Sequence, residues 1–284
     1  MQAPPSAQSH DYQLGRHIAT GAMCDVYEAL LSTGQTVAIK MLHACWCGND
    51  EVQARFHNEV DALMQIDDSG VISAHGRGLT SDDRPYVILE WLPWDLARLM
   101  KQTNIAPSPA EAHQVVTQVA AVMSRLHARN IIHRDLKPAN ILLSSMNLDS
   151  AEIKLADLGL AKLTNSSEHA GQLAHVSTAN NHAFGTWDYM APEQWMDVKT
   201  VGPAADVYAL GVIWFQMLAQ KLPFVAEDER SLMCLHLFEP PPLDLLAPPG
   251  ATPNTQALWR ARIAQMLSKT PTERPTMSTI AAWR

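Results

Sequence analysis

The chain has 284 residues, of which 47% are hydrophobic and 18% are charged, and its formal net charge is −8 at pH 7. This hydrophobic content is normal for a folded globular protein and too high for a disordered chain. The negative charge argues against a protein that binds nucleic acid. The length allows one large domain or two lobes that share a cleft.

Cysteine usage and apolar stretches favour a cytoplasmic protein. The lone Cys45-x-Cys47 pair is a weak metal signal, and with Cys24 and Cys234 it is more typical of reduced thiols. No basic stretch followed by an apolar run marks the N-terminus as a secretory signal. The longest apolar stretch, residues 207–219, is shorter than the roughly 20 residues that span a bilayer. We therefore expect no membrane segment within this chain, while its origin in a longer, membrane-anchored protein stays open.

The N-terminal third reads mainly as β-strands. Residues 1–11 are polar and proline-containing and predict a flexible N-terminus. Residues 36–42 are rich in β-branched side chains and predict a strand, as do residues 85–90. Between them, apolar residues recur at helical spacing over residues 51–66, ending in Leu63 and Met64. This part therefore predicts a sheet with one helix.

Beyond residue 93 the pattern becomes helical. Ser108, Pro109 and Glu111 form a capping box with proline at the first helical position, a strong helix-start signal. Residues 204–219 are apolar almost all round, so this helix is expected at the buried centre. The proline-rich residues 239–255 predict a loop, and two short helices are expected to close the chain.

These elements predict an α+β fold with two lobes. A flexible stretch (1–11) precedes a small β-rich N-lobe with one helix (12–92), and a larger α-helical C-lobe (93–284) follows a hinge near residues 90–93.

The segment from His133 to Asn140, just after a predicted helix, carries the clearest chemical signal. It fixes a carboxylate, a lysine and an amide within six positions, which suits in-line phosphoryl transfer. Asp135 would orient the attacking hydroxyl and accept its proton, Lys137 would neutralise charge on the moving phosphoryl group, and Asn140 would hold magnesium. The alternative is a surface loop with chance polar residues.

At this segment the sequence resembles the protein kinase family, specifically the serine/threonine branch of the eukaryotic-like (Hanks-type) kinases of bacteria. Lys137, two positions after Asp135, is typical of that branch, and the resemblance extends over residues 12–283. It implies the bilobal protein-kinase-like fold, with Mg²⁺ and ATP as cofactors. It also implies transfer of the γ-phosphate of ATP to serine or threonine hydroxyls of protein substrates.

Two further motifs follow the family's order. Asp157-Leu158-Gly159 resembles the metal-binding Asp-Phe-Gly element, so Asp157 would bind Mg²⁺. Lys40, within a Val-Ala-Ile-Lys strand, would be the phosphate-binding lysine, oriented by an ion pair with Glu59 of the following helix.

The phosphate-covering loop departs from the family pattern. Of its three glycines only Gly21 remains, because Ala19 and Cys24 replace the outer two. This substitution could crowd the phosphates and reduce nucleotide affinity. Cys24 is either an alkylatable thiol at the nucleotide mouth or an inert one.

By resemblance, Leu89 would be the gatekeeper, and backbone groups of Glu90 and Leu92 would hydrogen-bond the adenine. The adenine would sit between Ile18, Val26, Ala38 and Leu142, and these four apolar residues suit any hydrophobic core equally well. The full set of expected ATP-binding residues is Ile18, Ala19, Gly21, Cys24, Val26, Ala38, Lys40, Leu89, Glu90, Leu92 and Leu142.

Residues later in the chain are expected to form the scaffold. Thr186 would bond to Asp135 or Lys137 and help to recognise a hydroxyl-bearing substrate. Glu193 should form a buried salt bridge with Arg274. Asp206 is expected to anchor the backbone of the catalytic loop.

Arg134 implies activation by phosphorylation, because in the family such an arginine binds a phosphate on the activation segment. Ser177 and Thr178 are the favoured sites of autophosphorylation, which would occur in trans. Self-association of the chain is a separate expected interaction. Two alternatives stay open, a pseudokinase that acts as a nucleotide-binding scaffold and a small-molecule phosphotransferase. The physiological substrate, the signal and the oligomeric state do not follow from these residues.

Overall fold

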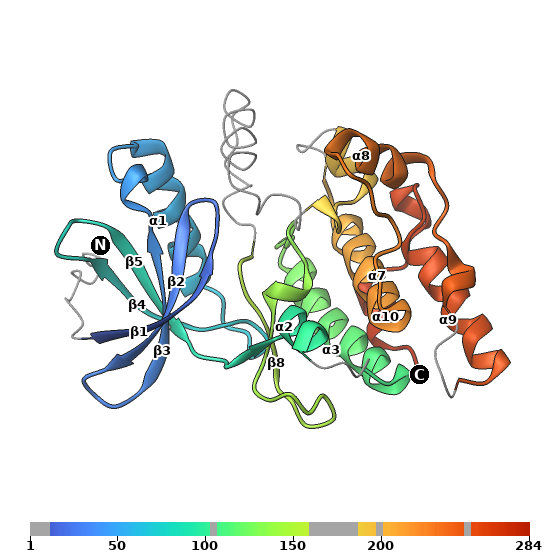
Figure 1. Cartoon of the computed structure of the whole chain (residues 1–284), viewed down its shortest axis with the longest axis horizontal. Helices are drawn as coiled ribbons and strands as arrows, with labels where there is room; N and C mark the ends of the chain where they lie inside the picture. Colours follow the sequence, from blue (N-terminus) through green and yellow to red (C-terminus); the bar gives the residue numbers. More distant parts are fainter. Residues whose placement is uncertain (1–11, 103–106, 159–186, 197–200, 247–250) are drawn as a thin grey trace. The chain divides into compact units, whose positions relative to one another are not determined.

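The computed structural model describes residues 12–102, 107–158, 187–196, 201–246 and 251–284. Within these ranges the chain forms two compact units, one of residues 12–91 and the other of residues from 92 onward. The predicted division into a β-rich part with one α-helix and a helical part is confirmed (Figure 1).

The first unit is a five-stranded antiparallel sheet in the order β1-β2-β3-β5-β4. Its elements are β1 (Tyr12–Thr20), β2 (Cys24–Leu31), β3 (Thr36–Leu42), a 3₁₀ helix (Ala44–Trp46), α1 (Asp50–Met64), β4 (Ala74–Leu79) and β5 (Pro85–Glu90). Helix α1 packs against β4 and β5 (Figure 1).

Strand β3 is fixed in this unit by the alternation of its side chains, and helix α1 by its N-terminal cap and its buried apolar stripe. Val37, Ile39 and Met41 of β3 lie in a buried cluster, while the intervening positions, including Lys40, point to the other face. Helix α1 begins after Asn49, whose side chain accepts a hydrogen bond from the Val52 amide. Its predicted apolar stripe is buried as far as Val60, but Met64, at the last turn, is 45% exposed.

The second unit is mainly helical but also contains a small three-stranded sheet in the order β6-β7-β8. Its α-helices are α2 (Leu96–Gln102), α3 (Pro109–Ala128), α6 (Pro192–Met196), α7 (Ala204–Ala219), α8 (Glu229–Phe238), α9 (Pro253–Met266) and α10 (Met277–Ala281). Its strands are β6 (Trp94–Asp95), β7 (Ile141–Leu143) and β8 (Ile153–Leu155), and its 3₁₀ helices are Pro138–Asn140, Leu243–Leu245 and Pro271–Glu273.

Helix α7 is the centre of this unit, as its apolar sequence predicts. Nearly all of its residues are buried, and it packs against α3 and α9 (Figure 1). The predicted capping box of α3 is present, since Ser108 accepts a hydrogen bond from the Glu111 amide and Glu111 accepts one from the Ser108 amide. Helices α3 and α7 pack against each other in the core of the unit.

The proline-rich stretch 239–255 is not entirely a loop, so that prediction is wrong at its end. Helix α9 begins at Pro253, and Thr252 caps it by accepting a hydrogen bond from the Thr255 amide. Proline is tolerated at the first helical position because its missing N–H would have no helical partner there. Strands β6 to β8 and helix α8 were not expected from the sequence pattern.

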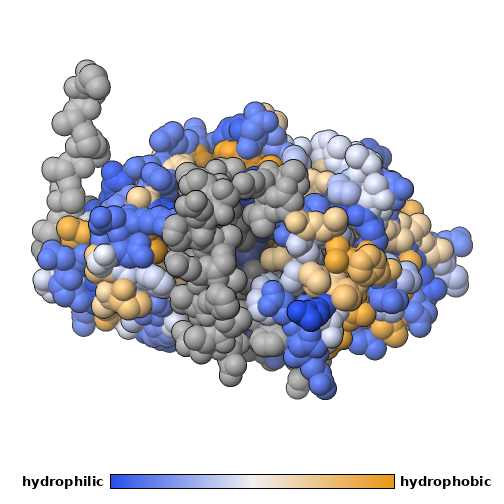
Figure 2. All heavy atoms as spheres, turned by 90° about the horizontal axis from the view of Figure 1, so that it is seen from above, coloured by the Kyte–Doolittle hydropathy of each residue, from blue (hydrophilic) through white to orange (hydrophobic). Residues whose placement is uncertain are grey.

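The hydropathy of the surface and of the helices fits the moderate hydrophobic content of the sequence. On the face drawn in Figure 2, hydrophilic residues predominate and hydrophobic ones form smaller areas. No helix among the described residues is both long enough and apolar enough to cross a bilayer.

Candidate active site

A buried carboxylate of α7 holds the backbone of the segment that contains Asp135. Asp206, whose side chain is 1% exposed, accepts hydrogen bonds from the backbone amides of His133 (2.9 Å) and Arg134 (2.8 Å). It also lies 2.8 Å from Nε2 of His127, at the end of α3. The predicted anchoring role of Asp206 is thereby confirmed, and the His127 contact is an addition that the sequence did not suggest.

The three groups predicted to carry the chemistry lie together. Lys137 Nζ is 2.9 Å from Asp135 Oδ2, and Asn140 Nδ2 donates to the backbone oxygen of Asp135 at 2.9 Å. The side chains of Asp135 and Lys137 are 20% and 23% exposed, so they are largely buried but still within reach of a reactant. This arrangement can take a proton from a hydroxyl and place a cation beside the resulting charge.

Asp157 is brought to Asn140 by the hairpin of β7 and β8. Ile141 pairs with Leu155, and the amide of Ala156, the next residue, donates to the backbone oxygen of Asn140 at 3.0 Å. Asp157 has a left-handed backbone (φ 51°), which is costly for a residue with a side chain and is typical of functional sites. The two candidate metal ligands therefore come from the same end of one hairpin.

The donors at this end suit Mg²⁺. They supply a carboxylate and an amide oxygen, since the nitrogen of the Asn140 amide is engaged with Asp135. No group of three or more His, Cys, Asp and Glu suited to a metal occurs in the described part of the chain. Such a sparse set fits Mg²⁺, which often uses one or two carboxylates together with water and phosphate oxygens.

In the first unit, Lys40 and Glu59 form the predicted ion pair. Lys40 Nζ on β3 donates to Glu59 Oε1 on α1 at 2.8 Å, and the two side chains are 16% and 19% exposed. The helix that carries Glu59 is positioned by its buried apolar stripe against the sheet, so the pair depends on the packing of α1.

The hairpin between β1 and β2 explains how the loop exists without its outer glycines. Ala19 pairs with Val26, and Cys24 pairs with Leu42, so both replaced positions lie in paired strands, with a shift of the β1–β2 register just before Ala19. Gly21 closes the turn by donating its amide to the Cys24 oxygen at 2.7 Å. Cys24 is only 6% exposed, which favours the inert-thiol alternative over an alkylatable one.

A polar cluster at this hairpin was missed by the sequence reasoning. Asp25 accepts a hydrogen bond from Thr20 at 2.7 Å and lies 3.4 Å and 3.3 Å from the Nε2 atoms of His17 and His43. Burial raises the pKa of Asp25, but the bonds from Thr20 and His17 and the proximity of His43 together hold it below its ordinary value. Thr20 and Asp25 are cross-strand partners. The sequence alone does not give this strand register, so it could not bring the two residues together.

The expected adenine-contacting residues fall into both units. Ala38 and Leu89 are cross-strand partners and are both buried, whereas Ile18 is 38% exposed. Leu92, which is buried, and Leu142 belong to the second unit.

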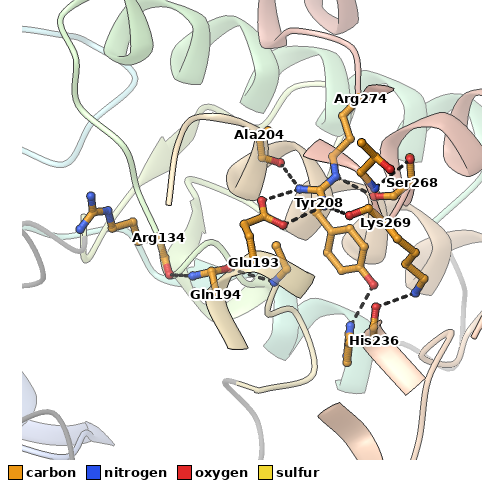
Figure 3. Close-up of polar contacts among 11 residues, drawn as sticks. Arg134, Glu193, Gln194, Ala204, Tyr208, His236, Ser268, Lys269 and Arg274 are labelled. Carbon is orange, nitrogen blue, oxygen red and sulfur yellow. Dashed lines mark hydrogen bonds and ion pairs between the residues drawn. The ribbon is translucent and has the colours of Figure 1, made fainter. Parts of the chain in front are cut away.

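The predicted salt bridge between Glu193 and Arg274 is confirmed as a bidentate pair (Figure 3). The two N–O distances are 2.6 Å and 2.9 Å, and the arginine side chain is fully buried. Arg274 also donates to the backbone oxygens of Ala204 and Ser268, so its buried donors are satisfied. This pair joins α6 to the end of the chain.

The segment before α6 contains two acidic groups shifted by burial. Burial raises the pKa of Asp188 to about 6, and burial together with the Asp188 charge raises the pKa of Tyr189. The Tyr189 hydroxyl donates to Gln216 of α7 at 2.7 Å. Gly159, Ser177, Thr178 and Thr186, which also entered the predictions, lie outside the described residues.

The chain is similar to known proteins over almost its whole length. A family model described as the protein kinase domain matches residues 12–283. Serine/threonine-protein kinase Pkn1 of Myxococcus xanthus is 35% identical over 277 residues, covering 96% of this chain and 37% of that protein. Serine/threonine-protein kinase PknA of Mycobacterium tuberculosis is 31% identical over 253 residues, covering 87% of this chain and 55% of that protein.

A solved structure supports the same fold. The crystal structure of Rad53 residues 1–466 in complex with AMP-PNP has a TM-score of 0.70 at 21% identity, covering 96% of this chain and 64% of that one. The present chain spans less than two thirds of the length of Pkn1 and PknA. Since the family model extends over almost all of the described residues, including the catalytic loop and both ion pairs, the chain belongs to the protein kinase domain family.

Proposed function

We propose that this chain is a serine/threonine protein kinase domain, which transfers the γ-phosphate of Mg-ATP to serine or threonine hydroxyls of protein substrates. The observation that carries this proposal is the grouping of Asp135, Lys137 and Asn140 on one anchored loop. The names of the serine/threonine-protein kinases Pkn1 and PknA support it.

In this proposal the second unit carries the transfer chemistry. Asp135 orients the substrate hydroxyl and accepts its proton, and the ammonium of Lys137 stabilises the negative charge that develops on the phosphoryl group. Asn140 and Asp157 would hold Mg²⁺, which would neutralise charge on the phosphates. The anchored loop provides these groups in a fixed orientation before the substrate arrives.

The first unit would hold the nucleotide. Lys40, oriented by Glu59, would contact the α- and β-phosphates, and the β1–β2 hairpin would cover them. The remaining ATP-binding residues are proposed as expected from the sequence, namely Ile18, Ala19, Gly21, Cys24, Val26, Ala38, Leu89, Glu90, Leu92 and Leu142. We likewise propose an N-lobe of residues 12–92 and a C-lobe of residues 93–284, which differs by one residue from the division of the two units before Leu92.

Regulation is proposed to act through Arg134. A phosphate on Ser177 or Thr178, added by a second copy of the chain in trans, would pair with this arginine and order the segment. Self-association would support such an exchange, and the cytoplasm would supply the ATP.

A phosphotransfer assay with radiolabelled Mg-ATP and a generic basic protein tests the proposed function. Asp135→Asn and Lys40→Met should each reduce transfer by about 100-fold or more, because each removes a group that acts on the reacting phosphate. Asp149→Asn, on an exposed turn, and Lys221→Met, also exposed, are matched controls and should retain wild-type rates. Mass spectrometry of the same proteins should find phosphate on the activation segment of the wild type and not of Asp135→Asn.

The outcome separates the alternatives. If the wild type binds Mg-ATP but transfers nothing, even with a phosphorylated segment, the protein is a nucleotide-binding scaffold. If it phosphorylates an aminoglycoside but no protein, it is a small-molecule phosphotransferase. Equal phosphorylation of the wild type and Asp135→Asn would reject autophosphorylation.

A further inference from the structure

Gln194, in the middle of α6, joins two segments that lie far apart in the sequence. Its side-chain oxygen accepts a hydrogen bond from the Ala191 amide at 2.9 Å. Its side-chain nitrogen donates to the backbone oxygen of Arg134 at 3.0 Å (Figure 3). The side chain thus uses one donor and one acceptor to link the start of α6 to the catalytic loop.

The carbonyl that Gln194 holds is directly connected to Asp135. It belongs to the peptide bond between Arg134 and Asp135, so its direction sets where the backbone of Asp135 begins. Arg134 has a left-handed backbone (φ 62°), which is unfavourable for a residue with a side chain. Such a conformation persists only when the surroundings hold it in place.

Arg134 is held on both sides. Asp206 accepts its backbone N–H at 2.8 Å, and Gln194 donates to its backbone C=O at 3.0 Å. Arg134, Asp135, Gln194 and Asp206 also line one small cavity, together with Tyr189. The two contacts therefore act on the same short piece of backbone, from α7 on one side and from α6 on the other.

We propose that Gln194 is a positioning residue for Asp135: its amide fixes the Arg134 carbonyl, and through it the orientation of the carboxylate that receives the substrate proton. The catalytic part of this inference rests on the proposed function. The same contact makes the placement of Asp135 depend on α6, which directly follows the segment containing Asp188 and Tyr189.

The chemistry of glutamine suits this position better than that of similar residues. An ionised glutamate could accept from Ala191 but could not donate to Arg134, and lysine or arginine could donate but not accept. Methionine has a similar length and offers neither a donor nor a strong acceptor. Gln194→Glu therefore removes the bond to Arg134 alone, and Gln194→Met removes both bonds.

These two variants are compared with the wild type by kcat, the KM for ATP and the melting temperature. Gln256→Met is the matched control, since Gln256 of α9 donates its side-chain amide to the Ala251 backbone oxygen at 3.2 Å, away from the catalytic loop. All proteins are brought to one phosphorylation state, verified by mass spectrometry, so that a loss of autophosphorylation does not pass for a loss of positioning.

We expect both variants to lower kcat by about 10- to 100-fold, since a displacement of about 1 Å at the reacting group can have that effect. The KM for ATP and the melting temperature should stay close to those of the wild type, and Gln256→Met should retain wild-type kcat. An unchanged kcat would overturn the proposal, whether or not the melting temperature falls.

The pH dependence of Gln194→Glu provides a signature specific to the bond. A protonated carboxyl regains an O–H that can donate to the Arg134 oxygen, so the ratio of variant to wild-type kcat should rise as the pH falls. The negative charges of Asp135 and Asp206, which line the same cavity with Arg134 and Tyr189, should raise the pKa of the introduced carboxyl. A ratio below one that stays constant with pH would overturn the assignment of the effect to this bond.

Hydrogen exchange tests the contact without relying on catalysis. The amides of His133 and Arg134, held by Asp206, should exchange several-fold faster in both Gln194 variants than in the wild type and in Gln256→Met. If the wild type transfers no phosphate yet this difference is present, the proposed function fails while the positioning contact stands. Unchanged exchange at these amides would overturn the contact itself.

Discussion

At the scale of single residues, two strongly shifted pKa values occur in the second unit, near the Glu193–Arg274 pair. His236 is fully buried, with Nδ1 3.0 Å from the Tyr208 hydroxyl, and Lys269 Nζ donates to the His236 backbone oxygen at 2.7 Å (Figure 3). Burial, followed by the Lys269 charge, lowers the pKa of His236 to about 3. Burial, followed by the Arg274 charge, lowers the pKa of Lys269 to about 8. His236 is therefore neutral in the folded protein at neutral pH.

This histidine should make folding sensitive to mild acid. The unfolded chain protonates His236 below its ordinary pKa of 6.5, whereas the folded chain does so only near pH 3, so stability falls as the pH drops through this interval. Between about pH 7 and about pH 5, His236 should account for about 2 kcal/mol of lost unfolding free energy. His236→Gln, which stays neutral throughout, should lose that much less, as measured by urea unfolding at the two pH values.

The exposed His75 of β4 offers the matched control for this measurement. His75→Gln should show the same pH-dependent loss as the wild type. An equal loss in His236→Gln and the wild type would contradict the assigned role of His236.

At the scale of elements, the approach of α7 to α9 depends on a residue without a side chain. A Cβ atom added at Gly211 would lie 2.9 Å from Met266 Cβ and 3.1 Å from Leu267 Cδ2. Because Met266 Cβ is attached directly to the backbone of α9, it cannot move aside without moving the helix. Gly211 therefore allows the central helix to pack closely.

Gly211→Ala should have two opposing effects on the stability of this helix pair. Alanine favours a helix over glycine by about 1 kcal/mol, but overpacking a well-filled core typically costs about 1–3 kcal/mol. We expect the clash to dominate and the variant to unfold at lower urea concentration than the wild type. Gly48→Ala, where an added Cβ has nothing within 4 Å, should change the midpoint little. A stabilised Gly211→Ala would show that α9 shifts easily.

At the scale of the whole molecule, each unit by itself contains residues that are proposed to bind Mg-ATP. Lys40 and Glu59 belong to the first, and Asp135, Asn140 and Asp157 belong to the second. Binding of Mg-ATP should therefore stabilise the protein as a whole, by about 2.7 kcal/mol at a concentration 100 times the Kd. The matching readout is an increase in melting temperature on addition of Mg-ATP.

Removing a ligand group from either unit should reduce that increase. Lys40→Met acts on the phosphates and Asp157→Asn on the metal, so each should weaken the thermal shift, and a chelator should weaken it in the wild type. If one variant keeps the full shift, the substituted residue does not contribute to binding of Mg-ATP. Lys221→Met, an exposed lysine, serves as the control.

The sequence by itself determined the local chemistry and most of the elements. Asp135, Lys137 and Asn140 could be grouped in advance because they lie within six positions of one loop, where chain connectivity keeps them close. Likewise, the capping box of α3 and the apolar surface of α7 are short-range patterns. The distant pair Glu193–Arg274 could be expected only from the family resemblance.

Only the tertiary structure revealed the contacts that link distant segments through non-periodic geometry. The left-handed backbone of Arg134 has no signal in residue type, because arginine rarely adopts it, and so its hold by Gln194 was not foreseen. The same holds for the gathering of Thr20 and His43 around Asp25, which depends on strand register. Residue type and spacing specify which groups are available, whereas the packing of α6, α7 and the sheet decides which of them meet.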